Sequence, residues 1–435
     1  MAWIDRVWDV GVTVAKPLVT AIGGASGRGR RAVAGRRAAL RRFEDWSHLT
    51  RDVRPLVWLH APSVGEALMA QAIARALREQ VDVQIAFTYF SPSAERVAGQ
   101  VGADVSGYLP WDTPHDVNRT LDVLRPALVA FVRTEIWPGL VRRAHDRGVP
   151  IALVNAPLAE TSSRLRPLAR IALGTAWSLL DRVGAVSADD AARFPRLGVD
   201  PARIRVTGDA RFDQVAARVE RLDPDAPLLR RMRDPAVTTI VAGSTWPTDE
   251  AIVLDAFERV HAQRPARLII APHEPIPTHI DALLFAAACR TLSASRLRHV
   301  ERADDALPDV IVVDRMGVLA ELYAVGRVAY VGGGFGRRGL HSVIEPAALG
   351  LPVAFGPLVG NAREALHLAA AGGGVVVTDA ESLRAHLERF ITSDRPGRSA
   401  REFVESRRGG AARNARLVAE LLAGHDATPH DLRGG

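Results

Sequence analysis

The feature that most constrains the fold of this chain is an alternation of short apolar runs with longer amphipathic stretches, repeated in two successive series. Short runs rich in β-branched and aromatic residues are typical of buried strands, and apolar residues three or four positions apart are typical of helices. Such an alternation favours a mostly parallel sheet with helices on both faces. The first series predicts strands at residues 56–61, 83–90, 127–132, 150–155, 183–186 and 204–207.

The second series starts at residue 238, and a chain of 435 residues is too long for one ordinary core. We therefore expect two doubly wound α/β domains at 46–210 and 236–410, with a linker at 211–235 that is rich in Asp, Pro and Arg. Residues 411–435 should form a closing helix and a polar tail. The second series predicts strands that begin at 238 and lie at 267–271, 310–314, 328–331, 353–355 and 375–378.

Charge and cysteine content restrict the partners. A net charge of +7 points to an anionic partner, which is nucleic acid, a membrane surface or a phosphorylated substrate. We expect no nucleic acid, because basic residues are not interleaved with aromatic ones and no nucleic-acid motif is present. The single cysteine, Cys289, excludes an internal disulfide, and no Cys/His cluster has the spacing of metal ligands, so we expect no bound zinc.

Residues 1–45 are expected to associate with a membrane. Trp3, Val7, Trp8 and other apolar residues lie near one face of a predicted helix. Four charged side chains within residues 1–22 are too many for a spanning helix, so an amphipathic helix in the membrane interface is favoured. The arginine-rich segment that follows would attract anionic lipid. The alternative is that the helix docks on the protein's own core and that the arginines are only a solvated face.

A glycine-rich loop at 332–339 is a candidate phosphate site. It follows a strand-like run and enters a short helix after Ser342 that Gly350 closes. Glycines let a phosphate approach the backbone, and a helix N-terminus favours its charge. The glycine spacing also matches a dinucleotide fingerprint, but that motif needs an acid after the next strand, whereas Glu345 lies inside the helix. The plainer alternative is a tight turn.

Residues that follow strands are further candidates, because ligands bind beyond the carboxyl ends of parallel strands. In the first series, Glu66 and Glu135 are predicted to project into one crevice, although Glu66 is alternatively a stabiliser of its helix N-terminus and Glu135 a buried turn acid. In the second series, the residues after strands suit a nucleotide, with His273 alternatively a surface turn residue. The carboxylates and amide expected at ribose hydroxyls are Glu345, Asn361 and Glu364.

Six motifs taken together resemble the 3-deoxy-D-manno-octulosonic acid (Kdo) transferase family. The similarity runs from the N-terminal segment to about residue 425, with the motifs in order in both predicted domains. It implies a GT-B fold with an acceptor-binding N-terminal domain, a nucleotide-sugar-binding C-terminal domain and a catalytic cleft. The motifs are His-Ala-Pro-Ser-Val-Gly-Glu at 60–66, Tyr-Leu-Pro-Trp-Asp at 108–112, Thr-Glu-Ile-Trp-Pro at 134–138, Val-Asn-Ala-Pro-Leu at 154–158, Val-Ala-Gly-Ser-Thr at 241–245 and Ile-Glu-Pro-Ala-Ala at 344–348.

The resemblance also implies metal-independent, inverting transfer of Kdo from CMP-Kdo to a lipid A precursor in lipopolysaccharide biosynthesis, without a cofactor, at the cytoplasmic face of the inner membrane. By position, Glu66 matches the family's proton acceptor, and Glu135 and Arg211 match groups that stabilise the transition state. A carboxylate suits that first role, because an acceptor hydroxyl must lose its proton as the bond forms. Substrate contacts are expected at Ser63, Gly65, Ser244, Thr245, Pro272, His273, Met316, Gly317, Val318, Gly334, His341, Ser342, Val343, Ile344, Glu345, Asn361 and Glu364.

Several positions depart from the family pattern. Arg211 stands in place of a lysine, Pro272-His-Glu in place of Pro-Arg-His, Arg133 where a glutamate is frequent and Ser342 where asparagine is usual. These changes bear on donor affinity and acceptor choice more than on the reaction class. Two other functions stay open: a GT-B glycosyltransferase that uses a UDP- or GDP-sugar, and a non-catalytic nucleotide-binding module at a membrane.

Overall fold

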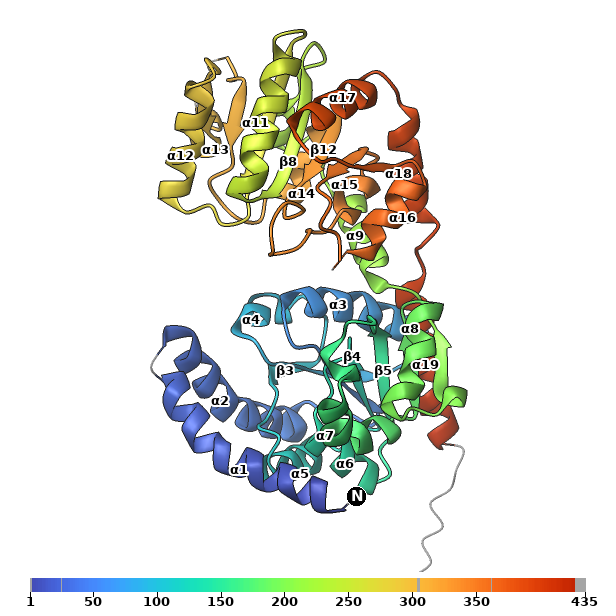
Figure 1. The fold of residues 1–435 in the computed structure, drawn as a ribbon. Coiled ribbons are helices and arrows are strands. Elements are labelled where there is room, and N and C mark those ends of the chain that lie inside the picture. The colour runs from blue at the N-terminus through green and yellow to red at the C-terminus, as the bar shows by residue number, and fades with distance from the viewer. Residues whose placement is uncertain (1, 25, 303–305, 361, 427–435) are drawn as a thin grey trace, which may run out of the picture. The chain divides into compact units, whose positions relative to one another are not determined.

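The structure of the protein is a computed structural model that describes the chain apart from residues 1, 25, 303–305, 361 and 427–435 (Figure 1). The chain forms two compact units. The first comprises Met1–Gln214 and Arg408–Gly435, and the second comprises Val215–Arg407.

The first unit is built on a parallel sheet. Its strands among the described residues have the order β3-β2-β1-β4-β5-β6-β7. All six strands that the sequence predicts here are confirmed to within one or two residues. β3 was missed, because Val-Ser-Gly-Tyr is too short and mixed to read as an apolar run. The strands are β1 Leu56–His60, β2 Gln84–Tyr89, β3 Val105–Tyr108, β4 Leu128–Val132, β5 Ile151–Ala156, β6 Arg182–Ala185 and β7 Ile204–Val206.

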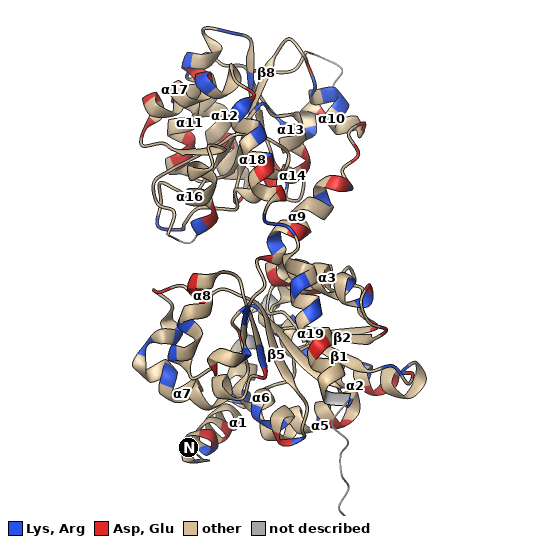
Figure 2. Ribbon diagram, turned by 90° about the vertical axis from the view of Figure 1, so that its right-hand side faces the viewer, with Lys and Arg blue, Asp and Glu red and all other residues tan. Residues whose placement is uncertain are grey.

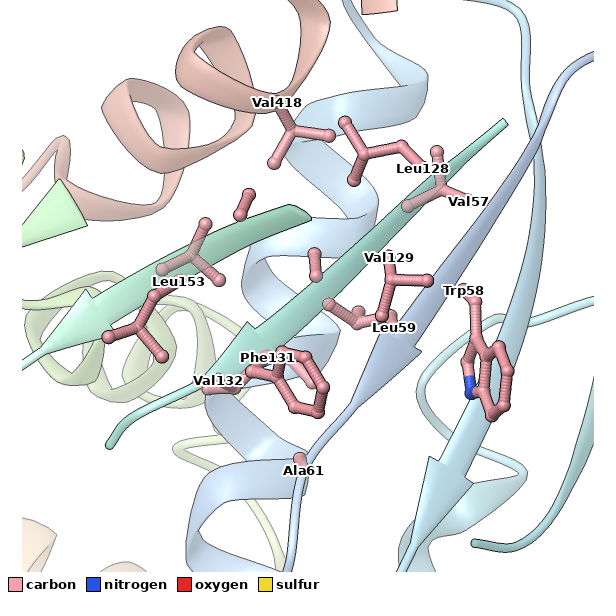
Figure 3. Packing of buried hydrophobic residues seen from close by; sticks show 14 of the residues in the cluster. Val57, Trp58, Leu59, Ala61, Leu128, Val129, Phe131, Val132, Leu153 and Val418 are labelled. Carbon is pink, nitrogen blue, oxygen red and sulfur yellow. The ribbon is translucent and has the colours of Figure 1, made fainter. Parts of the chain in front are cut away.

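Helices cover both faces of this sheet (Figure 1). On one face lie α3 Val64–Arg78, α4 Pro92–Ala98 and α19 Gly410–Asp426, and on the other α5 Pro114–Leu124, α6 Pro138–Asp146 and α7 Pro167–Ser178, while the short α8 Ala188–Arg193 packs beside β6 and β7. Figure 3 shows Val418 of α19 close to Val57 and Leu128 of the sheet. The closing helix therefore belongs to the core of the first unit, although it follows the second unit in the chain.

Two long helices at the N-terminus, α1 Ala2–Gly24 and α2 Gly27–Leu49, pack along the β3 side of the first unit. α1 docks with its polar side. Asp9 pairs with Arg143 at 2.7 Å, the indole nitrogen of Trp8 donates to Asp112 at 2.8 Å, and Lys16 pairs with Asp116 at 2.6 Å. Figure 2 shows the Lys and Arg positions of α1 and α6 in blue and their Asp and Glu positions in red, near the N-terminus.

The opposite side of α1 is an exposed apolar stripe. We define the stripe by its six residues, which are all exposed: Trp3, Val7, Val10, Val14, Leu18 and Ile22. Membrane binding and docking on the protein are the two alternatives that the sequence predicts for this helix. The helix docks on the protein, and the stripe on its other side is exposed to solvent. The apolar face predicted from the sequence includes Trp8, but Trp8 lies on the docked side, where it donates to Asp112. In the described part of the chain, no helix combines the length and apolar character needed to cross a membrane.

The second unit contains another parallel sheet, with the order β10-β11-β9-β8-β12-β13-β14 among the residues described. The predicted strands are again confirmed, and β10 was missed because Ala-Ser-Arg is short and polar. The strands are β8 Thr238–Thr245, β9 Ala266–Pro272, β10 Ala294–Arg296, β11 Val310–Val312, β12 Val328–Val331, β13 Val353–Phe355 and β14 Gly374–Val376.

The helices of the second unit form two apolar layers against its sheet. One layer contains α11 Pro247–His261, α12 Pro277–Ala288 and α17 Ala380–Ile391, and the other contains α10 Pro227–Met232, α13 Leu297–Val300 and α14 Leu319–Leu322. The remaining helices are α15 Ile344–Ala348, α16 Arg363–Ala370 and α18 Arg395–Glu405.

The segment 211–235, predicted as a linker, is largely helical. Helices α9 Ala210–Glu220 and α10 occupy most of it, and the boundary between the units lies inside α9. Phe212, Val215 and Ala216 are buried at helical spacing. The many Asp and Arg residues of this segment concealed that periodicity.

Candidate functional site

Glu66 lies in the first turn of α3, directly after β1. The Ser63 hydroxyl, at the N-cap position, donates a hydrogen bond to the Glu66 carboxylate and does not accept one from the backbone N–H groups of the helix. A side chain at the neighbouring Gly65 would meet no atom within 4 Å, so the surroundings of this turn are open. Glu66 is thus a half-buried carboxylate, oriented by a hydroxyl, at the carboxyl end of a central strand.

Glu135 follows β4, the strand that pairs with β1 on the side away from β2. The chain turns sharply before it, because Arg133 has a left-handed φ of 71° and its N–H donates to the Val154 carbonyl at 3.0 Å. Burial raises the pKa of Glu135, the charge of Arg164 opposes this shift, and the charge of Glu66 adds to it. The two glutamates therefore interact electrostatically where the strand order of the sheet reverses, which is where doubly wound sheets bind ligands.

Arg211 is held by Asp209, with nitrogen–oxygen distances of 2.8 and 2.7 Å. Burial by itself would raise the pKa of Asp209, but the charge and hydrogen bonds of Arg211 and the charge of Arg133 outweigh it, so the carboxylate is ionised. The side-chain oxygen of Asn155 accepts from the Ala210 N–H at 2.9 Å and fixes this turn after β7.

The three residues predicted to be catalytic thus lie after strands of one sheet, and Glu66 and Arg211 are each hydrogen-bonded to a polar side chain. Arg164 was not predicted, although its charge acts on Glu135 and burial lowers its own pKa. It lies in the short 3-10 helix Ser163–Leu165, well beyond the end of β5, where reasoning from strand ends gives no signal. Asn155 was part of a motif, but nothing in the sequence indicated which backbone group it would bind.

The glycine-rich loop of the second unit follows β12, which pairs with β8. Asp249 is fully buried and accepts hydrogen bonds from the Gly333 and Trp246 N–H groups, both at 2.9 Å, and from the Tyr330 hydroxyl at 2.8 Å. The Gly332 N–H donates to the Gly243 carbonyl at 2.9 Å. The backbone N–H groups of Gly332 and Gly333 therefore already donate to other parts of the protein.

Close packing explains why three residues of this loop are glycine. A Cβ atom would lie 2.4 Å from the Ser244 carbonyl oxygen at Gly332, 2.1 Å from the Gly339 carbonyl oxygen at Gly333, and 2.6 Å from the Gly356 nitrogen at Gly334. Only backbone without side chains fits there. We expected these glycines to admit a phosphate, whereas their immediate neighbours are other parts of the backbone. Gly336 is open, with Thr248 at 3.8 Å.

Three rings and one guanidinium group stack on one another close to this loop. The His273 ring lies 4.8 Å from that of Trp246 and 4.3 Å from that of His341, and the Arg338 guanidinium covers the Trp246 ring at 3.9 Å. Burial and the neighbouring His273 lower the pKa of His341 to about 4, so His341 is neutral at pH 7. His273 is part of this stack rather than an isolated turn residue.

Glu345 lies in the first turn of α15, and Arg218 of α9 pairs with it at 3.2 Å. Burial raises the pKa of Glu345, and Arg218 opposes that shift. The helix begins at Ile344, slightly later than predicted, although the Ser342 hydroxyl accepts from the Ile344 N–H at 3.3 Å. Gly350 has the left-handed φ of 79° expected after a helix end.

The other predicted contact residues differ in accessibility. Val343 and Ile344 have fully buried side chains, so a ligand would reach these two residues only through their backbone atoms. The Thr245 hydroxyl donates to Glu250 at 2.9 Å. Met316 and Ser342 are exposed, and Glu364 is buried in the first turn of α16. Pro272 ends β9, Ser244 has a left-handed φ of 54°, and Gly317 and Val318 precede α14. Asn361 lies outside the described residues.

A family model described as 3-deoxy-D-manno-octulosonic-acid transferase (kdotransferase) matches residues 36–214. A 3-deoxy-D-manno-octulosonic acid transferase from Bordetella pertussis is 32% identical over 337 residues, which cover 74% of this chain and 75% of that protein. The chain belongs to the Kdo transferase family. The Haemophilus influenzae member is 27% identical over 84% of this chain and 87% of its own length.

Two solved structures share the GT-B fold. A UDP-GlcNAc 2-epimerase from Neisseria meningitidis has a TM-score of 0.59 at 12% identity and covers 85% of this chain and 100% of that one. A glycosyltransferase from Rickettsia africae has a TM-score of 0.57 at 12% identity, covering 87% and 100% of the two chains. At such identities the likeness concerns the fold alone. Within the described part of the chain, no three His, Cys, Asp or Glu residues form a group that could hold a metal ion.

Proposed function

We propose that this protein is a metal-independent, inverting Kdo transferase that uses CMP-Kdo as donor and a lipid A precursor as acceptor. The observation that carries the proposal is the interacting pair Glu66 and Glu135 at the carboxyl ends of the paired strands β1 and β4, in a chain of this family. The first unit binds the acceptor and the second unit binds the donor.

Glu66 takes the proton of the acceptor hydroxyl. The hydroxyl becomes nucleophilic only as it loses that proton, so the base must be a carboxylate placed within hydrogen-bond reach. The Ser63 hydroxyl orients one Glu66 oxygen and leaves the other available. Glu135, whose pKa burial raises, and Arg211 stabilise the transition state.

The donor is bound by the residues after β8, β9, β11 and β12. We expect donor contacts from the exposed Met316 and Ser342, from the stacked His273 and His341, and from Glu345. Glu345 accepts from ribose hydroxyls of CMP, and the partner Arg218 favours its ionised form. Transfer uses no cofactor.

The protein acts at the cytoplasmic face of the inner membrane, with the exposed stripe of α1 in the membrane interface. An apolar helix face at headgroup depth is stabilised by burial, and the net charge of +7 adds attraction to anionic lipid. Such a position brings the first unit to an acceptor that is itself a phosphorylated lipid.

Donor choice and the base are tested with the purified full chain. CMP should raise the thermal midpoint of the protein, and UDP and GDP at the same concentration should not. Glu66→Gln should abolish turnover with CMP-Kdo while the shift by CMP persists. Glu79→Gln, at the exposed C-terminal end of the same helix, is the matched control and should retain activity. Full activity of Glu66→Gln would contradict the assignment of the base.

A further inference from the structure

A small cavity in the first unit lies between α1, α2 and the segment that follows β3. Its volume is about 220 Å³, and Lys16 of α1, Arg36 and Arg37 of α2, and Trp111 after β3 contribute to its wall. Ligand pockets for whole small molecules have volumes of about 300–1,000 Å³. This cavity therefore suits a head group rather than a complete lipid.

Arg36 is the most unusual residue of the wall, because only 8% of it is exposed. Its guanidinium carbon lies 4.5 Å from the ring centre of Phe90, 4.8 Å from that of Trp111 and 5.4 Å from that of Tyr108. Its nitrogens donate to the Ala32 and Phe90 carbonyls, both at 3.3 Å. Among the described residues no carboxylate pairs with it, and burial lowers its pKa, opposed only by Tyr108.

A buried cation without a counter-ion is costly, and an anion that enters the cavity would offset that cost. The other charged residues of the cavity wall do not neutralise this excess of positive charge. Lys16 is paired with Asp116 at 2.6 Å, whereas Arg37 is exposed and has no carboxylate partner in the part of the chain described. Three cations and one carboxylate face the cavity, so the positive charge is in excess.

The other part of the wall is apolar and consists of Val33, Leu40, Pro110 and Trp111. A ligand of matching chemistry carries an anionic head and at least a short hydrocarbon segment.

The location links the cavity to both the proposed site and the stripe. The Arg36 guanidinium donates to the carbonyl of Phe90, directly after β2, so Arg36 lies at the carboxyl ends of the strands, where Glu66 follows the neighbouring β1. On the other side, the cavity is lined by the helix whose outer face is the exposed stripe.

We propose that this cavity binds the phosphate head of an amphiphile, with its first carbons against Val33, Leu40 and Trp111. Arg36 and Arg37 hold the phosphate. Two molecules have this chemistry: the phosphorylated acceptor, in which case the inference rests on the proposed function, and an anionic phospholipid, in which case it does not.

Titration calorimetry on the full chain tests the cavity with dihexanoyl phosphatidic acid below its micellar concentration. Inorganic phosphate and dihexanoyl phosphatidylcholine are the comparison probes. The phosphatidic acid should bind more tightly than either. Arg37→Ala should weaken it by roughly tenfold, the loss of one charge-assisted hydrogen bond. Thr20→Trp, which fills the cavity from α1, should remove the binding.

Arg96→Ala is the control, because Arg96 of α4 is exposed and lies outside the cavity wall. It should bind like the wild type. Arg36 is left unchanged because its contacts with three rings support the fold. Equal binding of phosphatidic acid by the wild type and by Arg37→Ala and Thr20→Trp proteins with normal thermal midpoints would overturn the inference, as would no binding by the wild type.

Acceptor kinetics in detergent then identify the source of the phosphate. If the acceptor occupies the cavity, Arg37→Ala raises KM for the phosphorylated acceptor with little change in kcat, and a dephosphorylated acceptor shows no such difference. If a phospholipid occupies it, the acceptor kinetics of Arg37→Ala match the wild type while binding of phosphatidic acid is still weakened. The calorimetry needs no turnover, so failure of the proposed function leaves the cavity testable.

Discussion

Trp8 and Asp112 are 104 residues apart in the chain, and the indole nitrogen of Trp8 donates to the Asp112 carboxylate at 2.8 Å. The same carboxylate accepts from the Gly139 and Leu140 N–H groups at the start of α6, both at 2.8 Å. Helix α6 begins directly after the segment that carries Glu135. The N-terminal helix is therefore bonded to the element that positions one of the two interacting glutamates.

Trp8→Phe should loosen this connection, because the ring is kept and the donor is lost. The free energy of unfolding should fall by about 1–2 kcal/mol at pH 8, since a buried acceptor loses a hydrogen bond. Burial raises the pKa of Asp112, and the hydrogen bonds of Gly139, Trp8 and Leu140 oppose that shift.

Loss of the Trp8 bond should raise that pKa further, so the defect should shrink as the pH falls and Asp112 becomes protonated. Denaturant titrations at pH 8 and pH 5.5 measure this. Trp3→Phe, at an exposed tryptophan of the same helix, should change nothing. A defect of equal size at both pH values would contradict the expected role of Asp112.

The exposed stripe should be needed for membrane binding and not for folding. Val7→Glu with Val14→Glu removes two apolar side chains and adds two negative charges, which should weaken binding to vesicles with anionic lipid by at least about tenfold. Stability should be unchanged, because these valines are 60% and 69% exposed. Cosedimentation measures the binding, with Val53→Glu as an exposed control outside the helix. If the double variant bound vesicles as tightly as the wild type, the stripe would not be the membrane-binding surface.

Arg218→Ala should impair the use of donor in a pH-dependent way. Burial raises the pKa of Glu345 and Arg218 opposes this, so without Arg218 the carboxylate should become protonated at a higher pH. The KM for CMP-Kdo should then increase more at pH 6 than at pH 8, with a small effect on kcat. Steady-state kinetics at the two pH values decide this, and a pH-independent change would mean that Glu345 does not accept from the donor in its charged form.

His60 should make the first unit sensitive to acid. It is fully buried, and burial is the main cause that lowers its pKa to about 3, with a further contribution from the charge of Arg36. Below pH 6.5 the unfolded chain binds a proton that folded His60 does not, so this contribution to stability is present above pH 6.5 and is lost as the pH falls towards 3.

Between pH 7.5 and pH 5, wild type should therefore lose about 2 kcal/mol more unfolding free energy than His60→Gln, at about 1.4 kcal/mol for each pH unit below 6.5. Denaturant titrations at the two pH values provide the comparison. If the wild type and His60→Gln lost the same unfolding free energy between pH 7.5 and pH 5, His60 would become protonated in the folded state as readily as in the unfolded chain.

Much of the architecture can be predicted from local sequence patterns. The features that cannot be predicted are those that depend on contacts between residues far apart in the chain. Apolar runs located twelve strands, whereas β3 and β10 lack such runs and depend on their neighbours in the sheet. The pattern of α1 predicts an amphipathic helix but not which side docks, because its partners Asp112 and Arg143 are distant in the chain.

The candidate site shows the same limit. Strand ends indicated Glu66 and Glu135 directly. Arg164 and the network around Asp249 depend on how the folded chain brings loops together, so no spacing in the sequence reveals them. The glycines of the loop after β12 were recognised as necessary, but for a phosphate rather than for the backbone packing that surrounds them.

Under the proposed function, the protein transfers Kdo from CMP-Kdo to a lipid A precursor. Mass spectrometry of the lipid, after incubation of the purified protein with both substrates, detects this transfer and counts the sugars added. The lipid should become heavier by one or more Kdo units, with one CMP released for each. An unchanged lipid with CMP-Kdo, together with a glycosylated product from a UDP- or GDP-sugar, would contradict the proposed function.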